Sequence, residues 1–147
     1  MTAGEVDEFL AGARTLQVAT INPDGTPHLV AMWYVPRGDG SLAFWTYGRS
    51  QKVQNLKRDP RISCMVEEGT PGDYGSLRGV SVKGTAVVVE DPDVVVKLGE
   101  DIASRYFGGL DDATRAGVAH TSAKRVAVIV TAERVISWDH RKLSSAS

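Results

Sequence analysis

The sequence lacks several features that would assign a protein to a class at once. Its 147 residues hold one cysteine, Cys64, which excludes an internal disulfide and a cysteine metal cluster. Its 17 Lys and Arg residues balance 18 Asp and Glu residues, so charge gives no reason to expect a nucleic-acid or membrane partner. No apolar run approaches the roughly 20 residues of a membrane helix, and the N-terminus lacks a signal-peptide charge pattern. We expect one domain, residues 1–147, in the cytoplasm.

Motifs for metal binding and nucleophilic catalysis are missing too. The three histidines, His28, His120 and His140, are far apart and belong to no HxxxH or HxxE pattern. Ser81 lies in the segment GVSVKG, which is not the GxSxG elbow of a serine nucleophile. We therefore predict no metal site, and the catalytic residues stay unassigned.

What the sequence does contain is a series of strand patterns. Apolar residues alternate at period two from Leu16 to Ile21, and residues 22–25 supply turn chemistry before a second strand, which predicts a hairpin. Strands are expected at residues 16–21, 27–35, 42–47, 62–67, 78–90 and 124–138, the last either as one long strand or as two with a kink near Ala132 and Glu133. Helices are expected at 4–13 and 50–58, after the Asp91-Pro92 start signal, and after Asp111.

Consecutive strands with helices confined to two insertions favour a closed antiparallel barrel over a parallel sheet with crossover helices. Closure also removes the exposed edges that valine-rich strands would otherwise present. The predicted fold is mainly β: a six-stranded antiparallel barrel with a few peripheral helices.

The segment from Ser41 to Pro60 carries the strongest functional pattern. An aromatic strand containing Trp45 leads through a glycine into Arg49, Ser50 and Lys52, where a short helix is expected to begin. A flat apolar wall beside cationic and hydroxyl groups at a helix N-terminus suits a phosphorylated aromatic cofactor. A strand, a turn and a solvated basic helix would give the same pattern, so this segment alone leaves both interpretations open.

Several motifs follow one another in a familiar order. They are Ala19-Thr20-Ile21, Asp24-Gly25-Thr26-Pro27-His28, Met32-Trp33-Tyr34, Thr46 with Lys52 and Asn55-Leu56, and Arg58-Asp59-Pro60-Arg61. This order resembles the split β-barrel flavin and deazaflavin oxidoreductase superfamily, the group related to pyridoxamine 5′-phosphate oxidase. The closing Ile136-Ser137-Trp138-Asp139 with Lys142 is similar to the C-terminus of its B branch, many of whose members use the deazaflavin coenzyme F420.

The resemblance implies a homodimer with the cofactor in a groove between subunits. A small barrel fills its interior with side chains, so a cofactor has to lie outside, where a second subunit can cover it. In the family, positions matching Thr46 and Lys52 contact the cofactor phosphate. Arg49 offers a planar fork and Ser50 a hydroxyl to the same group.

The family places the cofactor ring on the strand that contains Met32 and Trp33. Alternation sends Val30, Met32 and Tyr34 to one face and Trp33 to the other, and the sequence leaves open which face lines the core. We expect Trp138 to cross from the partner subunit and cover the ring. The predicted cofactor-binding residues are Met32, Trp33, Trp45, Thr46, Arg49, Ser50, Lys52 and Trp138.

The expected function follows from the resemblance. It is a reductase that passes hydride from reduced coenzyme F420 to an oxidised organic acceptor, while the protein binds, orients and excludes water. An FMN-dependent oxidoreductase of the same fold and a non-catalytic deazaflavin-binding protein are the alternatives. The basic residues between Arg49 and Arg61 and the Trp138-Asp139 pair favour the deazaflavin, because FMN has no acidic tail. The acceptor is not identified, and the helical insertion at 92–118 either narrows the pocket or only covers the barrel.

Overall fold

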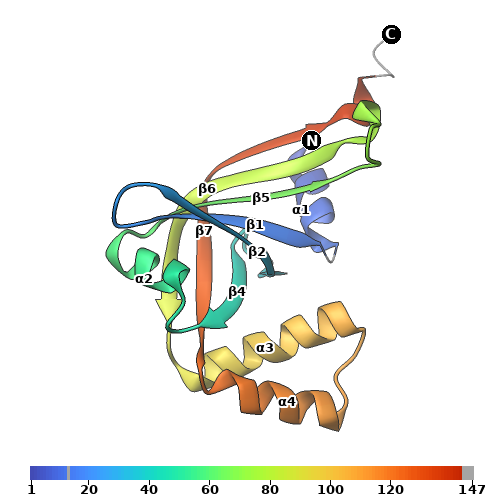
Figure 1. Cartoon of the computed structure of the whole chain (residues 1–147). Coiled ribbons are helices and arrows are strands. Elements are labelled where there is room, and N and C mark those ends of the chain that lie inside the picture. Colours follow the sequence, from blue (N-terminus) through green and yellow to red (C-terminus); the bar gives the residue numbers. More distant parts are fainter. Residues whose placement is uncertain (13, 144–147) are drawn as a thin grey trace.

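The computed structural model describes residues 1–12 and 14–143, which form one curled antiparallel sheet with helices around it (Figure 1). The strands are β1 (Thr15–Ile21), β2 (Pro27–Trp33), β3 (Val35–Pro36), β4 (Leu42–Tyr47), β5 (Arg61–Glu68), β6 (Arg78–Val89) and β7 (Arg125–Asp139). The helices are α1 (Ala3–Ala11), α2 (Gln51–Arg58), α3 (Pro92–Phe107) and α4 (Asp112–Ser122), with short 3₁₀ turns η1 (Tyr74–Ser76) and η2 (His140–Lys142). The helix predicted at 4–13 is α1, and its expected residue Ala13 lies outside the described residues.

The strand order is β2-β1-β5-β6-β7-β4-β3, and its two ends are consecutive in the chain. Only Tyr34 separates β2 from β3, so a single segment passes from one edge of the sheet to the other and closes the barrel. The prediction of a mainly β antiparallel split barrel is confirmed, but the count of six strands is wrong. There are seven in the described chain, because the amide of Tyr34 donates to the hydroxyl of Tyr106 (3.2 Å) instead of continuing a strand ladder.

The last strand, which the sequence left as one strand or two, is the single strand β7, and it carries a bulge against β6 near the expected kink. Lys83 pairs with Arg134 and Gly84 with Ala132, so the pairing register skips Glu133. A Cβ placed on Gly84 would lie 1.8 Å from the carbonyl oxygen of Thr131, so a side chain at this position would clash with the β7 backbone.

The barrel interior is filled by alternating side chains from all the long strands. On β2 the inward face belongs to Val30 and Met32, which pack against the core, while Trp33 is 44% exposed. This answers the question that the alternation alone left open. Cys64 is buried in the core, and burial raises the pKa of its thiol to about 12.

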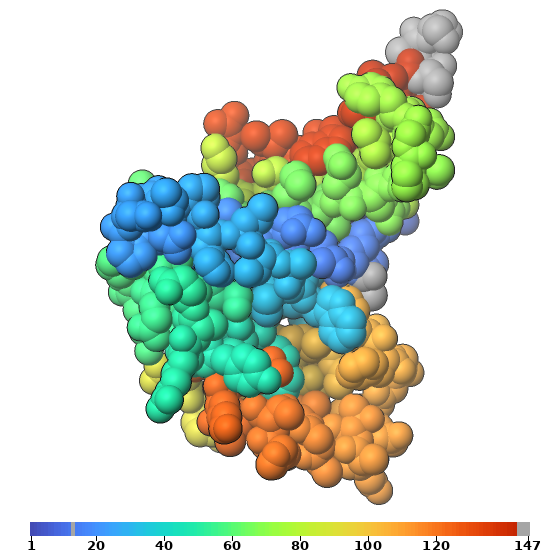
Figure 2. All heavy atoms as spheres, in the orientation of Figure 1, coloured from blue at the N-terminus to red at the C-terminus, as the bar shows by residue number. Residues whose placement is uncertain are grey.

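The two helical insertions lie at different places on the barrel. Helix α2 packs against β1 and β6, whereas α3 and α4 pair with each other and α3 packs on β3, β4 and β7. Figure 2 shows α3 and α4, in yellow and orange, as one lobe beneath the strands. Val95, Leu98 and Ile102 of α3 form a second apolar cluster with Ala43 and Ala127 of the sheet, so α3 is held firmly against the barrel.

Candidate cofactor site

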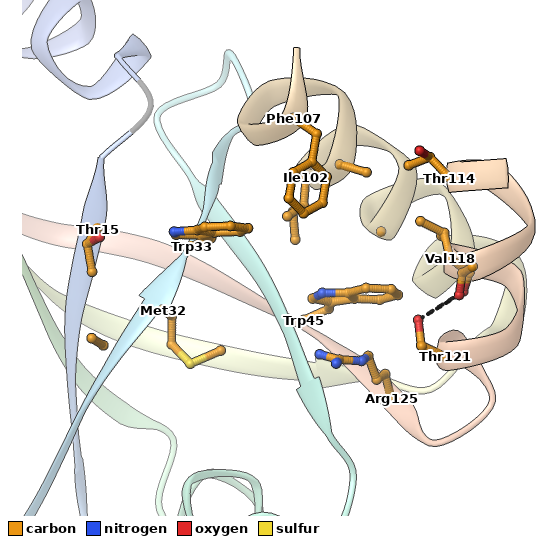
Figure 3. A pocket seen from close by; sticks show the side chains of 14 residues that line it. Thr15, Met32, Trp33, Trp45, Ile102, Phe107, Thr114, Val118, Thr121 and Arg125 are labelled. Atoms are coloured by element: carbon orange, nitrogen blue, oxygen red, sulfur yellow. Dashed lines mark hydrogen bonds between the residues drawn. The ribbon is translucent and has the colours of Figure 1, made fainter. Parts of the chain in front are cut away.

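A cavity of about 890 Å³ lies between the barrel and the α3–α4 pair (Figure 3). This volume is in the range of sites that bind small organic molecules. Its strand side is lined by Thr15, Ala31, Met32, Trp33, Trp45 and Arg125. Its helix side is lined by Gly99, Ile102, Ala103, Phe107, Thr114, Gly117, Val118 and Thr121. The helical insertion is therefore a wall of the cavity and does more than cover the barrel.

Trp45 forms one side of this cavity because α3 carries glycine opposite it. A Cβ on Gly99 would lie 2.4 Å from Cζ3 of Trp45 and 2.8 Å from Cγ1 of Val118. Only glycine leaves space for the indole to pack against the helix at this position. The Asp91-Pro92 signal predicts a helix here, but it does not show that one face of the helix borders an open cavity.

The mouth of the cavity is aromatic. The rings of Trp33 and Tyr106 are stacked with centroids 4.4 Å apart and planes at 6°, and Phe107 meets Trp33 edge-on at 5.6 Å. The hydroxyl of Tyr106 donates to the carbonyl of Arg14 (2.5 Å), while the guanidinium of Arg105 donates to three carbonyls, those of Leu10, Ala11 and Gly12. These bonds fix the end of α3 to the C-terminal end of α1 and to the segment that leads into β1, so this part of the cavity wall is held in place.

Arg125 occupies an unusual place at the floor of the cavity. Its guanidinium lies 4.5 Å from the ring centroids of both Trp45 and Tyr47, a cation–π arrangement on two faces. Its Nε is buried without a hydrogen-bond partner. Within the described chain no carboxylate pairs with this guanidinium.

Lys52 feels the positive charge of Arg125 and is also without a carboxylate among the described residues. Its side chain is 9% exposed, and its Nζ donates to Oγ1 of Thr46 (2.8 Å). Burial, and after it the charge of Arg125, lowers the pKa of Lys52. Two cations held near each other with no counterion are costly unless an anion binds between or beside them.

The N-terminus of α2, which directly precedes Lys52 in the chain, adds further polar groups. Ser50 is the N-cap residue, yet its side chain makes no capping bond, and its buried Oγ has no partner. Because a helix N-terminus also presents free amides and a partial positive charge, phosphate fits this arrangement. We call Thr46, Ser50, Lys52 and Arg125 the anion cluster. Arg49 is exposed at the turn before the helix.

Two other basic residues near α2 have carboxylate partners. Lys57 pairs with Glu90 (2.8 Å) and Arg61 with Asp59 (2.7 Å). Arg58 instead donates to the neutral carbonyl of Ile21. Lys57 and Arg61 therefore differ from Lys52 and Arg125, which have no carboxylate partner in the described chain.

A buried amide holds α2 in position. Asn55 is fully buried, and its Nδ2 donates to Oγ1 of Thr20 (3.0 Å) and to Oδ1 of Asn22 (3.1 Å), while Gln51 donates to its Oδ1 (2.8 Å). These bonds attach the middle of α2 to β1. They therefore set where Ser50 and Lys52 lie.

The structure brings together most of the predicted site residues. Met32, Trp33 and Trp45 line the cavity, and Thr46, Ser50 and Lys52 form most of the adjoining anion cluster. Trp138 is not among them. It lies one residue before the end of β7, where its Nε1 donates to Glu67 (3.0 Å) and its ring covers Gly79. Its reach into a partner's site stays a prediction.

Two features are absent from the part of the chain that the structure describes. In residues 1–12 and 14–143, no three His, Cys, Asp or Glu side chains gather as a metal ion would require. No helix in that same part of the chain combines the length and the apolar character needed to span a membrane.

The match to a protein family agrees with this fold. Residues 2–139 match the family model described as pyridoxamine 5′-phosphate oxidase. The chain therefore belongs to the pyridoxamine 5′-phosphate oxidase family, whose split-barrel oxidoreductase fold it has. The resemblance found in the motif order is confirmed.

Two solved structures are similar to this chain over most of its length. A solved structure of a conserved hypothetical protein from Mycobacterium tuberculosis is 44% identical with a TM-score of 0.90, covering 98% of this chain and 88% of that one. A solved structure described as an F420 reductase is 27% identical with a TM-score of 0.70, covering 88% of this chain and 94% of that one.

Two other matches are more limited. Protein bli-3 of Neurospora crassa is 35% identical over 80 residues, which is 54% of this chain and 36% of that protein. The match thus spans about a third of the length of that relative. The heme storage protein HutZ from Vibrio cholerae, 18% identical with a TM-score of 0.70 and covering 91% of this chain and 92% of that one, shares the fold alone.

Proposed function

We propose that this protein is an oxidoreductase that uses coenzyme F420 to reduce an organic acceptor. The observation that carries the proposal is the anion cluster: two cations without a carboxylate partner in the described chain and an orphaned serine hydroxyl beside an aromatic cavity. The 27% identical F420 reductase has the same fold over most of its length, which supports the choice of cofactor.

The residues fit a phosphorylated ring in two parts. Lys52, Ser50 and Thr46 would hold the phosphate, with the fork of Arg125 and the exposed Arg49 adding charge. Met32 and Trp33 would bound the ring on the β2 side of the cavity. When bound, the reduced deazaflavin supplies a hydride, and the protein orients the ring and keeps water from it.

The proposal includes a homodimer. By the pairing register, Met65, Ser81 and Ile136 lie in one row across β5, β6 and β7, and their side chains point to the outside of the barrel. Met65 is 38% and Ile136 44% exposed, and Leu29 on β2 is 67% exposed. A second copy seated on this apolar face would bury it. Trp138, two residues after Ile136, lies on the same face and would then meet the partner.

FMN is the second candidate because of one observation. The acidic tail of coenzyme F420 needs unpaired basic residues, yet Lys57 and Arg61 already have carboxylate partners. FMN needs only the phosphate site. A protein that binds the deazaflavin without turning it over is the remaining alternative.

The experiment mixes the protein with reduced coenzyme F420 and a panel of quinones, enones and tetrapyrroles, and follows the absorbance of the oxidised coenzyme. Acceptor-dependent oxidation that the Lys52→Ala variant loses supports the proposal. Tight coenzyme binding with no oxidation by any acceptor would make the protein a carrier instead of an enzyme.

A further inference from the structure

We propose that the helical half of the cavity is the acceptor site, and that it selects a flat, mainly apolar molecule without positive charge. This inference rests on the proposed function, since it assigns the second molecule of the same reaction. It concerns the part of the cavity bounded by Trp45, Ala103, Phe107 and Gly117, away from Met32.

Space for a second molecule exists beside α4. Gly117 lines the cavity, and a Cβ placed on it would meet nothing within 4 Å. Gly99, on the facing helix, is the opposite case, because the Trp45 ring already occupies the space above it. Ala103 also lines the cavity, and its small side chain takes up little of this space. The two glycines therefore have different roles: Gly99 seats the indole, and Gly117 leaves room next to it.

The shape of this space favours a flat ligand. Figure 3 shows the indoles of Trp33 and Trp45 both edge-on, with the cavity bounded by Ile102 and Phe107 on the helix side. Phe107 is 68% exposed, an unusual position for so large an apolar ring. Aromatic faces arranged in this way bury a planar molecule with little loss of its internal freedom.

The charges around the cavity exclude cations. Arg125 is the one charged side chain in the described lining, with Lys52 next to it, and no carboxylate lines the cavity. Polar groups are few: the hydroxyl of Thr121 donates to the carbonyl of Gly117 (3.0 Å) and so turns toward its own helix. A protonated amine would meet repulsion without a compensating partner, whereas an apolar ring loses nothing on entry.

The test uses 2-methyl-1,4-naphthoquinone as the probe, titrated by calorimetry into the protein with and without coenzyme F420. Gly117→Leu fills the open space and replaces a helical glycine, so it should fold at least as well as the wild type. It should weaken probe binding by roughly tenfold to a hundredfold, as filling an apolar site does. Gly4→Leu is the matched control, since it makes the same exchange at an exposed helical glycine of α1.

Each other outcome has a definite meaning. Equal probe affinity in wild type and Gly117→Leu overturns the acceptor site. Loss of coenzyme affinity in Gly117→Leu also overturns it, because the space would then hold the coenzyme ring. If the wild type binds the probe and Gly117→Leu does not, but neither binds the coenzyme, the pocket stands and the proposed function fails. Binding of 1-naphthylmethylamine as tight as that of the quinone would overturn the charge selection.

Discussion

Nζ of Lys52 donates a 2.8 Å hydrogen bond to Oγ1 of Thr46, which joins the first turn of α2 to strand β4. The bond leaves the ammonium buried, close to Arg125 and without a carboxylate in the described chain. Oγ1 of Thr46 accepts a hydrogen bond from one N–H of the ammonium, and the other two N–H groups can donate to an incoming anion. The Lys52–Thr46 bond therefore connects α2 to β4, and it also lies within the anion cluster.

Replacing Lys52 should weaken binding of the coenzyme. Hydrogen bonds to charged groups contribute about 1.5–3 kcal/mol, so Lys52→Ala is expected to raise the Kd for coenzyme F420 by roughly ten- to a hundredfold. Lys57→Ala is the control, because Lys57 lies on the same helix but already pairs with Glu90. Unchanged affinity in the Lys52 variant would remove the phosphate assignment.

The buried ammonium also makes stability depend on pH. Burial and Arg125 lower the pKa of Lys52 from its usual 10.5. Between the lowered pKa and 10.5 the unfolded chain holds more protons at this side chain than the folded protein, so the contribution to the free energy of unfolding rises with pH. Below the lowered pKa, Lys52 is charged in both states, and the full cost of burying its charge lowers the free energy of unfolding.

Lys52→Met removes this penalty and should raise Tm at neutral pH. The gain should shrink as pH approaches 10.5, and inorganic phosphate should stabilise the wild type more than the variant. Thermal unfolding across the pH range checks both effects, with Lys57→Met as the reference. A gain in Tm that stays constant with pH would show that Lys52 does not titrate in this way.

The two cavity glycines should respond oppositely to alanine. Gly99→Ala forces a methyl group to within 2.4 Å of the Trp45 ring, and overpacking of this kind costs about 1–3 kcal/mol. Gly117→Ala meets open space, so helix propensity should make it more stable by up to about 1 kcal/mol. Denaturant unfolding measures both, and the Gly99 variant should also shift tryptophan fluorescence. A neutral Gly99→Ala would mean that Trp45 lies elsewhere.

Removing the hydroxyl of Tyr106 should lower the stability of the fold even though the aromatic ring stays in place. It donates to the carbonyl of Arg14 and accepts from the amide of Tyr34. Tyr106→Phe keeps the stack on Trp33 but leaves these backbone groups unpaired, at a cost of about 1–3 kcal/mol. Hydrogen exchange should speed up at Tyr34 and along the last turn of α3. Tyr74→Phe, at an exposed tyrosine, should change neither; equal exchange in both variants would contradict this role.

The sequence predicts what depends on local spacing. Strand positions follow from period-two alternation, whereas the sequence left open whether the last strand is continuous or kinked near Ala132 and Glu133, where the structure has a bulge. Thr46, Ser50 and Lys52 can be placed together because they lie on one strand-turn-helix segment, where short-range geometry decides which groups converge.

Other features depend on pairings between distant segments. Arg125 enters the site because the β4–β7 register sets it opposite Tyr47, and no local pattern contains that register. The split of residues 27–36 into two strands requires the hydroxyl of Tyr106 from α3. The cavity itself needs both helices placed against Trp45. The predicted role of Trp138, which is to cover the cofactor ring of a partner subunit, depends on a second chain, and the fold of one chain does not test it.

The most direct measurement is a titration of the wild-type protein with coenzyme F420 and, separately, with FMN, followed by tryptophan fluorescence. Trp33 and Trp45 both line the cavity, so a bound ring should quench them. Our account predicts quenching by coenzyme F420 at micromolar or lower concentration, with FMN much weaker, and loss of the quenching in Lys52→Ala. Tighter binding of FMN would make the protein a flavin enzyme of the same fold. Binding of neither would contradict the central claim that the anion cluster and the aromatic cavity together hold this cofactor.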